Sequence, residues 1–393
     1  MSRHFLEFFA GGGMARLGLG PGWSCLFAND FDPVKGAAYR ANFPDAREHF
    51  SDADVWSLTA ADLPGPAALA WASSPCQDFS LAGGRAGLSG GRSSAFFGFW
   101  RLMEALDDAG RAPRLIVVEN VVGLLTSRDG ADFVALCAAL AGRGYRVGAI
   151  EADAADFTPQ SRPRLFVIAF RGEPQAELSG GGAFVTPAVA RARDRLEGAA
   201  RAAWTDWSPQ APAGRNTRLA DLLEPDEAVA WNPPDLTRSL VGMMSPGQAA
   251  RLEALRAAGG RHVGALFRRT RREEGRSVQR AEARFDGLAG CLRTPRGGSS
   301  RQSVIVVEDG AVRTRLLAPR EAARLMGLPE SYVLPPRVSA ALHVAGDGVC
   351  VPAVRWLAEA LLEPLLSGPS APPGLENLHP ACENPPSQSR AGA

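Results

Sequence analysis

The chain has 393 residues, 46% of them hydrophobic and 22% charged, which is the composition of a water-soluble globular protein long enough for two or three domains. Its formal net charge of +1 excludes a uniformly basic nucleic-acid binder, so any nucleic-acid surface must come from local clustering. No apolar run reaches about 18 residues and no signal-peptide pattern opens the chain, so we predict neither a membrane span nor a signal peptide. A cytoplasmic protein with reduced thiols is expected.

Two residue types limit the chemistry further. Six cysteines occur singly, at positions 25, 76, 137, 291, 350 and 382, and no Cys-x-x-Cys pair is present, so we predict no metal site. Lys35 is the only lysine, so nearly all positive charge is arginine, which suits contacts with phosphate and guanine. A GC-rich genome also produces this bias, so the bias alone assigns no function.

The first 170 residues alternate strand-like and helix-like segments. Strands are predicted at residues 4–10, 24–30, 67–74, 114–121, 145–152 and 164–170. Helices are predicted to begin at Met14 and to cover 34–42, 96–109 and 130–143. Strands that alternate with helices predict an α/β fold built on a doubly wound parallel sheet.

The pattern changes after Phe170. Residues 171–314 are rich in Arg, Gly, Pro and Trp and show weak periodicity, which predicts a second, smaller irregular domain over 171–338. Helical patterning returns near Pro319 and in "VPAVRWLAEALLEPLL", so residues 339–366 are expected to return to the first domain, which covers 1–170. The remaining segment, 367–393, is rich in Pro, Ser and Gly and is expected to be disordered.

A glycine-rich turn, "FFAGGGMARLGLG", follows the first predicted strand. Glycines let backbone amides at a helix N-terminus approach a ligand, and Asp30 ends the second strand at the spacing of an acid that binds ribose hydroxyls. A nicotinamide dinucleotide is one interpretation, but Arg16 occupies the last small-residue position of its fingerprint. S-adenosylmethionine needs the ribose acid without a pyrophosphate cradle and fits better. A tight turn that binds nothing is the remaining alternative.

The stretch "WASSPCQDFS" ends a buried strand with Pro75 and Cys76. Pro75 holds the residue before it in an extended conformation and has no amide hydrogen, so Cys76 is expected at the carboxyl edge of the sheet, where such folds place ligands. A lone cysteine is usually a buried apolar side chain, and we interpret Cys25, Cys137 and Cys350 in that way. Cys76 differs because its flanks are polar and glycine-rich.

Polar groups flank two further strands. Glu119 and Asn120 end the fourth predicted strand, and Gln160, Arg162 and Arg164 come at the start of the last one. Each group alone is explained equally well by a solvated strand end. If all of them converge on one edge, that edge holds a thiol nucleophile, a carboxyl and guanidinium groups.

In combination, the motifs of residues 4–366 resemble those of the cytosine-C5 DNA methyltransferase family of bacterial or phage type. "FFAGGGM" is similar to the family's cofactor loop, "FANDFD" to its ribose-binding acid with an adenine-stacking aromatic, and "SDADVWSL" to its acidic segment at the adenine amino group. "SPCQDFS", "ENV" and "PQSRPR" are similar to the nucleophile, Glu-Asn-Val and Gln-x-Arg-x-Arg motifs, and "RLLAPREAARLMGLP" to the helix before the final motif. All occur in the family's order with compatible gaps.

This resemblance implies S-adenosylmethionine as the cofactor and double-stranded DNA as the substrate. The residues that it assigns to cofactor binding are Phe9, Gly11, Gly13, Asp30, Phe31, Asp54 and Asp347. The residues that it assigns to catalysis are Cys76, Glu119, Arg162 and Arg164.

Two positions depart from the family's pattern. The cofactor loop usually ends Gly-Gly, but here Met14 follows Gly13. The final motif, usually Gly-Asn-Ser or Gly-Asn-Ala before Val, reads "GDGV" with Asp347 in place of Asn. Both positions are expected to affect the affinity for the cofactor more than the methyl-transfer reaction. We expect Asp347→Asn to preserve or tighten cofactor binding unless the aspartate has a role of its own.

The implied mechanism uses covalent catalysis. C5 of cytosine is a poor nucleophile, and a bond from the Cys76 thiolate to C6 would convert the ring into a reactive enamine. We expect Arg162 to lower the pKa of this thiol, and Glu119 to hydrogen-bond the N3 and amino edge of cytosine. The base that removes the C5 proton is not identifiable from the sequence.

Base flipping is also implied, because the target atom is stacked inside a duplex. The run of Gly, Ser and Arg over 80–94 is expected to close over the flipped base. The nucleic-acid contacts expected in the first domain are Gln77, Ser80, Arg85, Arg92 and Gln160.

Target recognition is assigned to the domain over 171–338. Residues 261–301 hold eleven arginines, no lysine and four acids, a net charge of +7. We expect Arg268 and Arg271 to contact phosphates, and Arg296 and Arg301, beside "GGSS", to contact bases. An ordinary solvated basic stretch is the alternative.

Other functions share parts of this pattern. A tRNA cytosine-C5 methyltransferase of the same fold uses the same chemistry, although the long insertion favours duplex DNA. A non-catalytic DNA-binding relative is disfavoured by the intact motifs, and a nicotinamide oxidoreductase by Arg16. The sequence reveals neither the recognised DNA sequence nor whether a cognate restriction endonuclease is the partner, and we expect a monomer.

Overall fold

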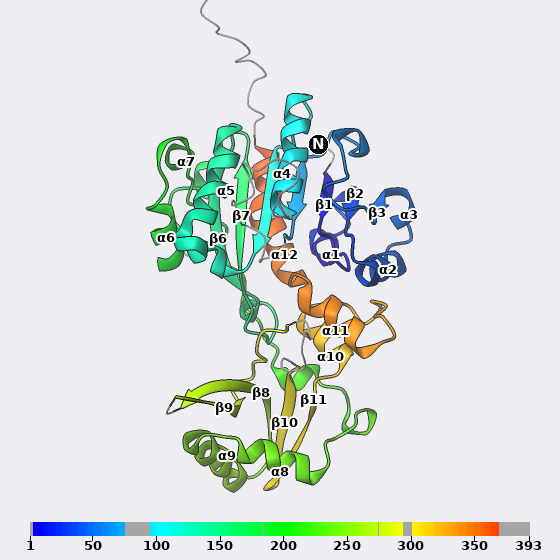
Figure 1. Cartoon of the computed structure of the whole chain (residues 1–393), viewed down its shortest axis with the longest axis vertical. Coiled ribbons are helices and arrows are strands. Elements are labelled where there is room, and N and C mark those ends of the chain that lie inside the picture. Colours follow the sequence, from blue (N-terminus) through cyan, green and yellow to red (C-terminus); the bar gives the residue numbers. More distant parts are fainter. Residues whose placement is uncertain (1–2, 75–94, 183, 274, 294–300, 369–393) are drawn as a thin grey trace, which may run out of the picture.

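The protein is described by a computed structural model over residues 3–74, 95–182, 184–273, 275–293 and 301–368. Figure 1 shows two lobes, which we call the first and the second. The first lobe surrounds a seven-stranded sheet, and the second surrounds a four-stranded sheet. Helices α10 (Pro319–Leu325) and α11 (Val338–Asp347) lie between the two.

The sheet of the first lobe has the strand order β3-β2-β1-β4-β5-β7-β6. Its strands are β1 (His4–Phe8), β2 (Ser24–Asn29), β3 (Phe50–Ser51), β4 (Leu69–Ala72), β5 (Leu115–Asn120), β6 (Arg146–Asp153) and β7 (Pro163–Phe170). The predicted doubly wound α/β fold is confirmed, with one correction to the parallel sheet. Strand β7 is antiparallel to both β5 and β6. Only nine residues, 154–162, join β6 to β7, and a parallel crossover needs roughly a dozen or more.

Helices cover both faces of this sheet, because the residues of its central strands alternate between two apolar clusters. In β5, Leu115 and Val117 belong to one cluster, while Ile116 and Val118 belong to the other. The second cluster lies under α4 (Ala95–Asp108) and α5 (Ala131–Gly142). The first lies under α1 (Met14–Leu19) and the C-terminal helices α12 (Val351–Leu357), a π-helical turn (Ala358–Leu362) and α13 (Glu363–Ser367). Short helices α2 (Pro33–Asn42) and α3 (Ala46–His49) flank the β2–β3 end.

Part of the segment predicted as the second domain packs on the first lobe. Helices α6 (Pro187–Arg193) and α7 (Gly198–Ala202) lie beside α5 and β6 (Figure 1). Trp207 is fully buried and its indole N–H donates to the carbonyl oxygen of Ile168 at 3.1 Å. The chain therefore leaves the first lobe well after Phe170.

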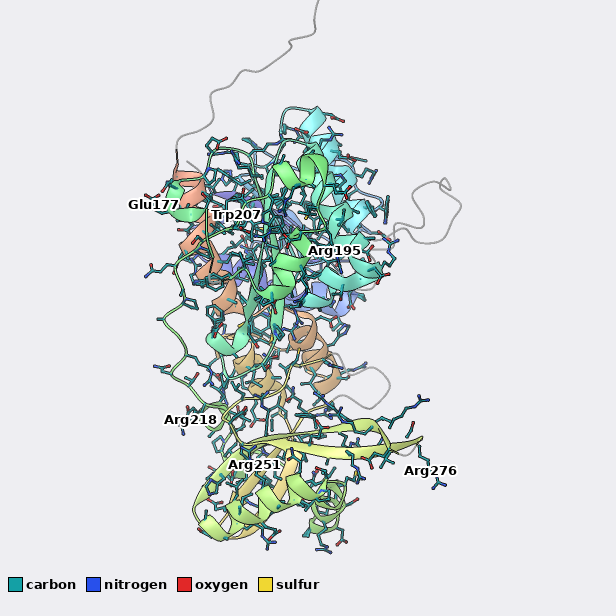
Figure 2. All side chains as sticks on the ribbon, turned by 90° about the vertical axis from the view of Figure 1, so that its left-hand side faces the viewer. Glu177, Arg195, Trp207, Arg218, Arg251 and Arg276 are labelled. Atoms are coloured by element: carbon teal, nitrogen blue, oxygen red, sulfur yellow. The ribbon has the colours of Figure 1, made fainter. Side chains whose placement is uncertain are left out.

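The second lobe is a regular antiparallel sheet rather than the irregular structure predicted. Its strands, β8 (Arg261–Glu273), β9 (Arg276–Arg284), β10 (Ser303–Glu308) and β11 (Ala311–Leu316), have the order β11-β10-β8-β9. Helices α8 (Pro234–Gly242) and α9 (Pro246–Ala258) pack on one face through Leu240, Met244 and Leu252. The outer halves of β8 and β9 extend beyond β10 as a two-stranded hairpin (Figure 2).

A buried ion pair fixes the return from the second lobe. Arg315, at the end of β11, and Glu321, in α10, lie 2.6 Å apart and are both almost inaccessible to solvent. Glu321 also accepts hydrogen bonds from the backbone amides of Ala318 and Glu224. This network orients α10 and α11 toward the first lobe. Among the described residues, the structure contains no helix of the length and apolarity required to span a bilayer.

Candidate active site

The glycine turn after β1 and the acid after β2 are joined directly. The Asp30 carboxylate accepts hydrogen bonds from the backbone N–H of Gly11 and of Asp32, each at 2.9 Å. Burial raises the pKa of Asp30 above its ordinary value, and the nearby ammonium of Lys35 opposes that shift. The two predicted cofactor elements therefore form one structure at the carboxyl edge of the sheet.

The glycine turn needs its glycines for two different reasons. Gly11 and Gly13 have φ values of +58° and +79°, a region that residues with a Cβ rarely adopt. Gly12 packs under Tyr332, whose hydroxyl donates to the Gly12 carbonyl oxygen at 2.8 Å. No heavy atom lies within 4 Å of the place where a Cβ of Gly11 would stand. The turn is thus open on the side of Gly11 and closed on the side of Gly12.

The other predicted cofactor residues lie around this turn. Phe9, the residue that follows β1, has a φ of +57°. The Phe31 ring is 65% exposed, so a planar group could stack on it. Asp54 is exposed and accepts from the backbone N–H of Trp56 at 3.0 Å. Trp56, which the sequence analysis did not single out, is another partly exposed aromatic ring. An acid, an open glycine turn and an exposed ring fit an adenosine-containing ligand.

Asp347 has a partner of its own at this edge. Its carboxylate lies 2.9 Å from the Lys35 ammonium and 3.1 Å from Nε2 of His343. The Lys35 side chain is 18% exposed and comes from α2, whereas Asp347 is the last residue of α11. This ion pair ties the end of α11 to α2, beside the residues predicted to bind the cofactor.

Glu119 and Arg164 form an ion pair at the end of β5. Arg164 Nε lies 3.2 Å from the Glu119 carboxylate, and their side chains are only 15% and 9% exposed. Next to Glu119, the Asn120 side-chain amide donates to the Ser74 carbonyl oxygen at 3.0 Å. The predicted carboxyl therefore lies beside the strand end that leads into the Pro-Cys-Gln motif. Five predicted residues of the following segment, Cys76, Gln77, Ser80, Arg85 and Arg92, lie outside the described residues.

Arg162 is a buried structural cross-link, whereas the sequence analysis expected it to lower the pKa of Cys76, which lies outside the described residues. Its side chain is 1% exposed, and its guanidinium donates to three backbone carbonyl oxygens. These belong to Leu292 at 2.9 Å, Gly346 at 2.9 Å and Gly348 at 2.7 Å. Arg162 thus holds the end of α11 and the chain leaving β9 against the start of β7. This bonding gives it a positioning role and leaves Arg164 as the guanidinium next to Glu119.

Gln160 is also internal in this structure, although the sequence analysis expected it to contact nucleic acid. The side chain is fully buried. Its Nε2 donates to the Leu325 carbonyl oxygen at 2.9 Å, and its Oε1 accepts from the Leu292 amide at 3.0 Å. Sequence pattern did not reveal this, because a glutamine before a strand is equally compatible with a solvated surface.

The arginines of the second lobe divide between the two faces of the β8–β9 hairpin. Arg271 Nε donates to the Glu282 carboxylate at 2.8 Å, and Arg269 lies 3.6 Å from the same carboxylate. Arg268 is on the opposite face, because side chains alternate along a strand, and the described residues supply it with no ion-pair partner. Arg301 is exposed at the start of the segment before β10, whereas Arg296 lies outside the described residues.

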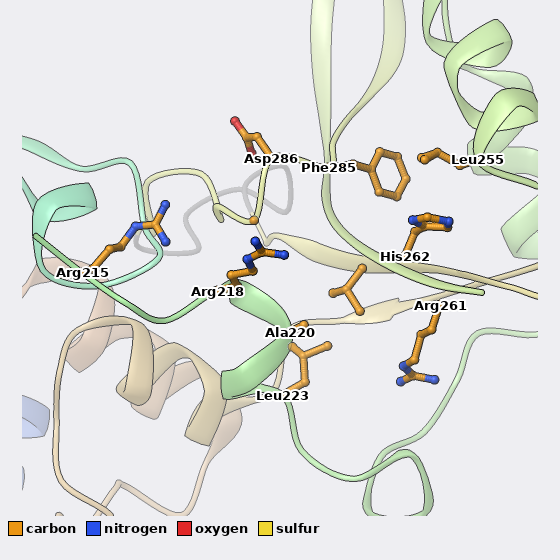
Figure 3. A pocket seen from close by; sticks show the side chains of 11 residues that line it. Arg215, Arg218, Ala220, Leu223, Leu255, Arg261, His262, Phe285 and Asp286 are labelled. Carbon is orange, nitrogen blue, oxygen red and sulfur yellow. The ribbon is translucent and has the colours of Figure 1, made fainter. Parts of the chain in front are cut away.

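A cavity of about 670 Å³ in the second lobe is separate from these residues (Figure 3). Arg215, Arg218, Arg261, His262 and Phe285 contribute to its lining. None of the predicted site residues lines it. The candidate active site is therefore the carboxyl edge of the seven-stranded sheet.

Known proteins share this combination of fold and motifs. The family model of the C-5 cytosine-specific DNA methylases matches residues 3–363. The Type II methyltransferase M.NlaX of Neisseria lactamica is 27% identical over 363 residues, which cover 91% of this chain and 95% of that protein. The Type II methyltransferase M.HhaI of Haemophilus parahaemolyticus is 25% identical over 361 residues, covering 90% and 92%.

Solved structures show the same fold at lower sequence identity. The S. pombe Dnmt2 methyltransferase superposes with a TM-score of 0.59 at 18% identity, covering 92% of this chain and 99% of that one. A putative DNA modification methyltransferase encoded within an E. coli prophage superposes with a TM-score of 0.53 at 17% identity, covering 93% and 100%.

Fold, motif order and family match define the class of protein as a methyltransferase. The chain belongs to the C-5 cytosine-specific DNA methylase family. It is accordingly an enzyme of the DNA (cytosine-5-)-methyltransferase class.

Proposed function

We propose that the protein transfers a methyl group from S-adenosylmethionine to C5 of cytosine within a specific sequence of double-stranded DNA. The observation that carries this proposal is the Glu119–Arg164 ion pair beside Ser74, at the same sheet edge as the Gly11–Asp30 hydrogen bond. A carboxyl for the base and an acid for the ribose thus belong to one site. The description of the family, C-5 cytosine-specific DNA methylase, supports the choice of DNA.

The cofactor would be held by the residues around the glycine turn. Asp30 would accept from the ribose hydroxyls, Phe31 would stack on the adenine ring, and Asp54 would lie at the adenine amino group. Asp30 has both oxygens engaged by backbone amides, yet each carboxylate oxygen can accept a second hydrogen bond. When bound, S-adenosylmethionine supplies an electrophilic methyl group.

The proposed reaction is covalent catalysis by Cys76. The thiolate sulfur forms a bond to C6 of cytosine, and the displaced electron pair makes C5 nucleophilic. C5 would then take the methyl group, the bond from that methyl to the sulfonium sulfur would break, and S-adenosylhomocysteine would be left. A base removes the C5 proton, the C5–C6 double bond returns, and the sulfur–carbon bond breaks to release Cys76 as a thiolate. Glu119 would bind the N3 and amino edge, with Arg164 fixing the orientation of its carboxyl.

The target cytosine would have to leave the duplex to reach Cys76. Residues 80–94, which contain Arg85 and Arg92, are proposed to close over the flipped base and contact the DNA around the gap. In the second lobe, the four-stranded sheet with α8 and α9 is proposed to recognise the target sequence. Arg296 and Arg301 are proposed as base contacts, because they flank "GGSS".

The test compares two substrates. The purified chain, incubated with S-adenosylmethionine labelled in its methyl group, should methylate plasmid DNA and leave tRNA unlabelled. The opposite result would favour a tRNA cytosine-C5 methyltransferase, and no transfer to either would favour a non-catalytic relative. Bisulfite sequencing of DNA from cells that express the chain would give the recognised sequence. A cognate restriction endonuclease is proposed as partner, because relatives carry the Type II name.

A further inference from the structure

The two cofactor motifs that depart from the family's pattern, at Met14 and at Asp347 with Gly348 beside it, are adjacent in space. Met14 stands where the loop usually has its second Gly, and it is 1% exposed at the start of α1. A Cβ placed on Gly348 would collide with the Met14 sulfur and would lie 2.8 Å from Met14 Cε. Gly348 itself stands where the final motif usually has Ser or Ala. The larger residue in one motif thus occupies the space freed by the smaller residue in the other.

The backbone does not require glycine at position 348. Its φ of −74° and ψ of 172° are extended values that any residue adopts. The three heavy atoms nearest to a Cβ at this position all belong to the Met14 side chain. Met14 and Gly348 are therefore sterically matched to each other.

Lys35 and Asp347 form a second matched pair next to the first. Asp347 is the last residue of α11, where the helix dipole disfavours a negative charge and would favour the neutral Asn of the family. The Lys35 ammonium, 2.9 Å away, offsets that cost. Burial alone would lower the pKa of Lys35, but the carboxylates of Asp30 and Asp347 raise it above its ordinary value, so the ammonium stays charged.

The positive charge beside Asp347 is a lysine in a chain whose other basic residues are all arginines. The chain has 43 lysines and arginines together, and the single lysine is at position 35. A compact ammonium can lie among the carboxylates of Asp30, Asp32 and Asp347, whereas a planar guanidinium is larger and needs more acceptors. Composition therefore gives an independent reason to regard Lys35 as fitted to this place.

Both pairs act on the same short segment. Arg162 holds the carbonyl oxygens of Gly346 and Gly348, on either side of Asp347. Lys35 holds the Asp347 side chain, and Met14 abuts Gly348. The segment 346–349 is thereby pressed against the glycine turn, next to Asp30.

We propose that Met14 with Gly348 and Lys35 with Asp347 are two compensating pairs that position residues 346–349 at the cofactor loop. Cofactor binding then depends on each pair and not on either of its members alone. These four are positioning residues. The inference rests on the proposed function, because the ligand whose binding they support is S-adenosylmethionine.

Two double-mutant cycles test the proposal, with S-adenosylhomocysteine as the probe and its Kd measured by calorimetry. Gly348→Ala alone should weaken binding by about tenfold, because it overpacks against Met14. Met14→Gly with Gly348→Ala should bind within about threefold of the wild type, because the clash is gone. In the second cycle, Asp347→Asn and Lys35→Met should each weaken binding, and the double variant should recover most of the loss.

A matched control is available on the same helix. Arg40→Met removes one positive charge from α2 and breaks an ion pair with Asp52, whose side chains are 39% and 54% exposed. This change should leave the Kd unaltered. If it weakens binding as much as Lys35→Met, the effect is general electrostatics and the specific pairing is wrong.

The outcomes separate this inference from the proposed function. If the wild type binds the probe but each double variant shows the combined losses of its two single variants, the pairs are not compensating and the inference fails. If the folded wild type does not bind the probe, the proposed cofactor is wrong. Measuring the Tm of the same variants then still tests whether the two residues of each pair depend on each other. Where a single variant does not fold, recovery of folding in the double variant supports the pair, and continued misfolding overturns it.

Discussion

Arg164 lies 3.2 Å from Glu119 because β7 runs opposite to β5. The reversal sets the start of one strand beside the end of the other, with Asn120 opposite Leu165. A parallel β7 would have carried Arg164 to the far end of the sheet. The connection 154–162 is too short for that arrangement, so the geometry of the ion pair follows from the length of a turn.

Changing either member of this pair should reduce methyl transfer more than cofactor binding. Glu119→Gln removes the carboxyl that we propose binds the cytosine edge and should lower kcat by about 100-fold or more. Arg164→Ala should act in the same direction, because it leaves a largely buried carboxylate unpaired. The measurement is kcat on plasmid DNA together with the Kd for S-adenosylhomocysteine. Arg164→Ala activity equal to that of the wild type would show that the ion pair does not orient Glu119.

Cys76→Ser should abolish methyl transfer, because a serine hydroxyl is a far weaker nucleophile than a thiolate at neutral pH. Cofactor binding should remain. DNA that contains 5-fluorocytosine at the target should form a stable covalent adduct with the wild type, since fluorine cannot leave as a proton does. The adduct is detected by denaturing gel electrophoresis. An adduct that forms equally well with Cys76→Ser would assign the nucleophile elsewhere.

Gln160→Leu should destabilise the protein, because it leaves the buried Leu292 amide without its acceptor and removes one of the two side-chain donors to the Leu325 carbonyl oxygen, the other being the Thr158 hydroxyl. Each unsatisfied buried group costs about 1–3 kcal/mol, so the free energy of unfolding in urea should fall measurably. Arg251→Ala is the control, since Arg251 is exposed on α9 (Figure 2) and should change stability by less than about 0.5 kcal/mol. If Gln160→Leu instead weakens DNA binding at unchanged stability, the original expectation of a nucleic-acid contact was correct.

Arg268 and Arg271 should differ in their contribution to DNA binding, although both stand in the same basic run. Arg268 has no ion-pair partner among the described residues, whereas Arg271 is engaged by Glu282. Loss of one phosphate contact lowers the slope of log K against log salt by roughly 0.9. We expect that change for Arg268→Ala and a smaller one for Arg271→Ala, with cognate and scrambled duplexes affected equally.

Arg301→Ala should behave differently, by blurring recognition at one position at a cost of about 1–3 kcal/mol for the cognate duplex. The comparison uses cognate and scrambled duplexes over a salt series. If Arg268→Ala lowers specificity and Arg301→Ala does not, the recognition surface is assigned the wrong way round.

Glu7 should make stability fall as pH rises. This carboxyl in β1 is 1% exposed, and burial raises its pKa from 4.5 to about 8, against the opposing effect of Arg16. Between these two pH values the unfolded chain has released a proton that the folded chain still holds, so the folded state loses stability across that window. Glu7→Gln should therefore be less sensitive to pH and more stable than the wild type at pH 8. Urea unfolding at pH 5 and pH 8 tests this, and an unchanged difference between the two proteins would contradict it.

Local pattern alone determined most strands of the first lobe and the location of its motifs, but not the reversed direction of β7. Apolar runs bounded by glycine and proline gave the strands, because a strand buried on both faces must be apolar throughout, as β4 and β5 are. The order of motifs then gave the family. The second sheet was missed because β8 and β9 carry many arginines on an exposed hairpin, where no buried face imposes alternation on the sequence.

Only the tertiary structure decided what the polar residues of these motifs do. Gln160 and Arg162 are polar residues of the kind usually found at a surface, yet both are buried. Their side chains donate to carbonyl oxygens of distant segments, at Leu325, Leu292 and Gly346. From the sequence, Asp347 is only a departure from a motif. The structure shows that it forms an ion pair with Lys35, which is 312 positions earlier in the chain. A sequence states which donors and charges exist, but their partners are set by the folding of segments that are remote along the chain.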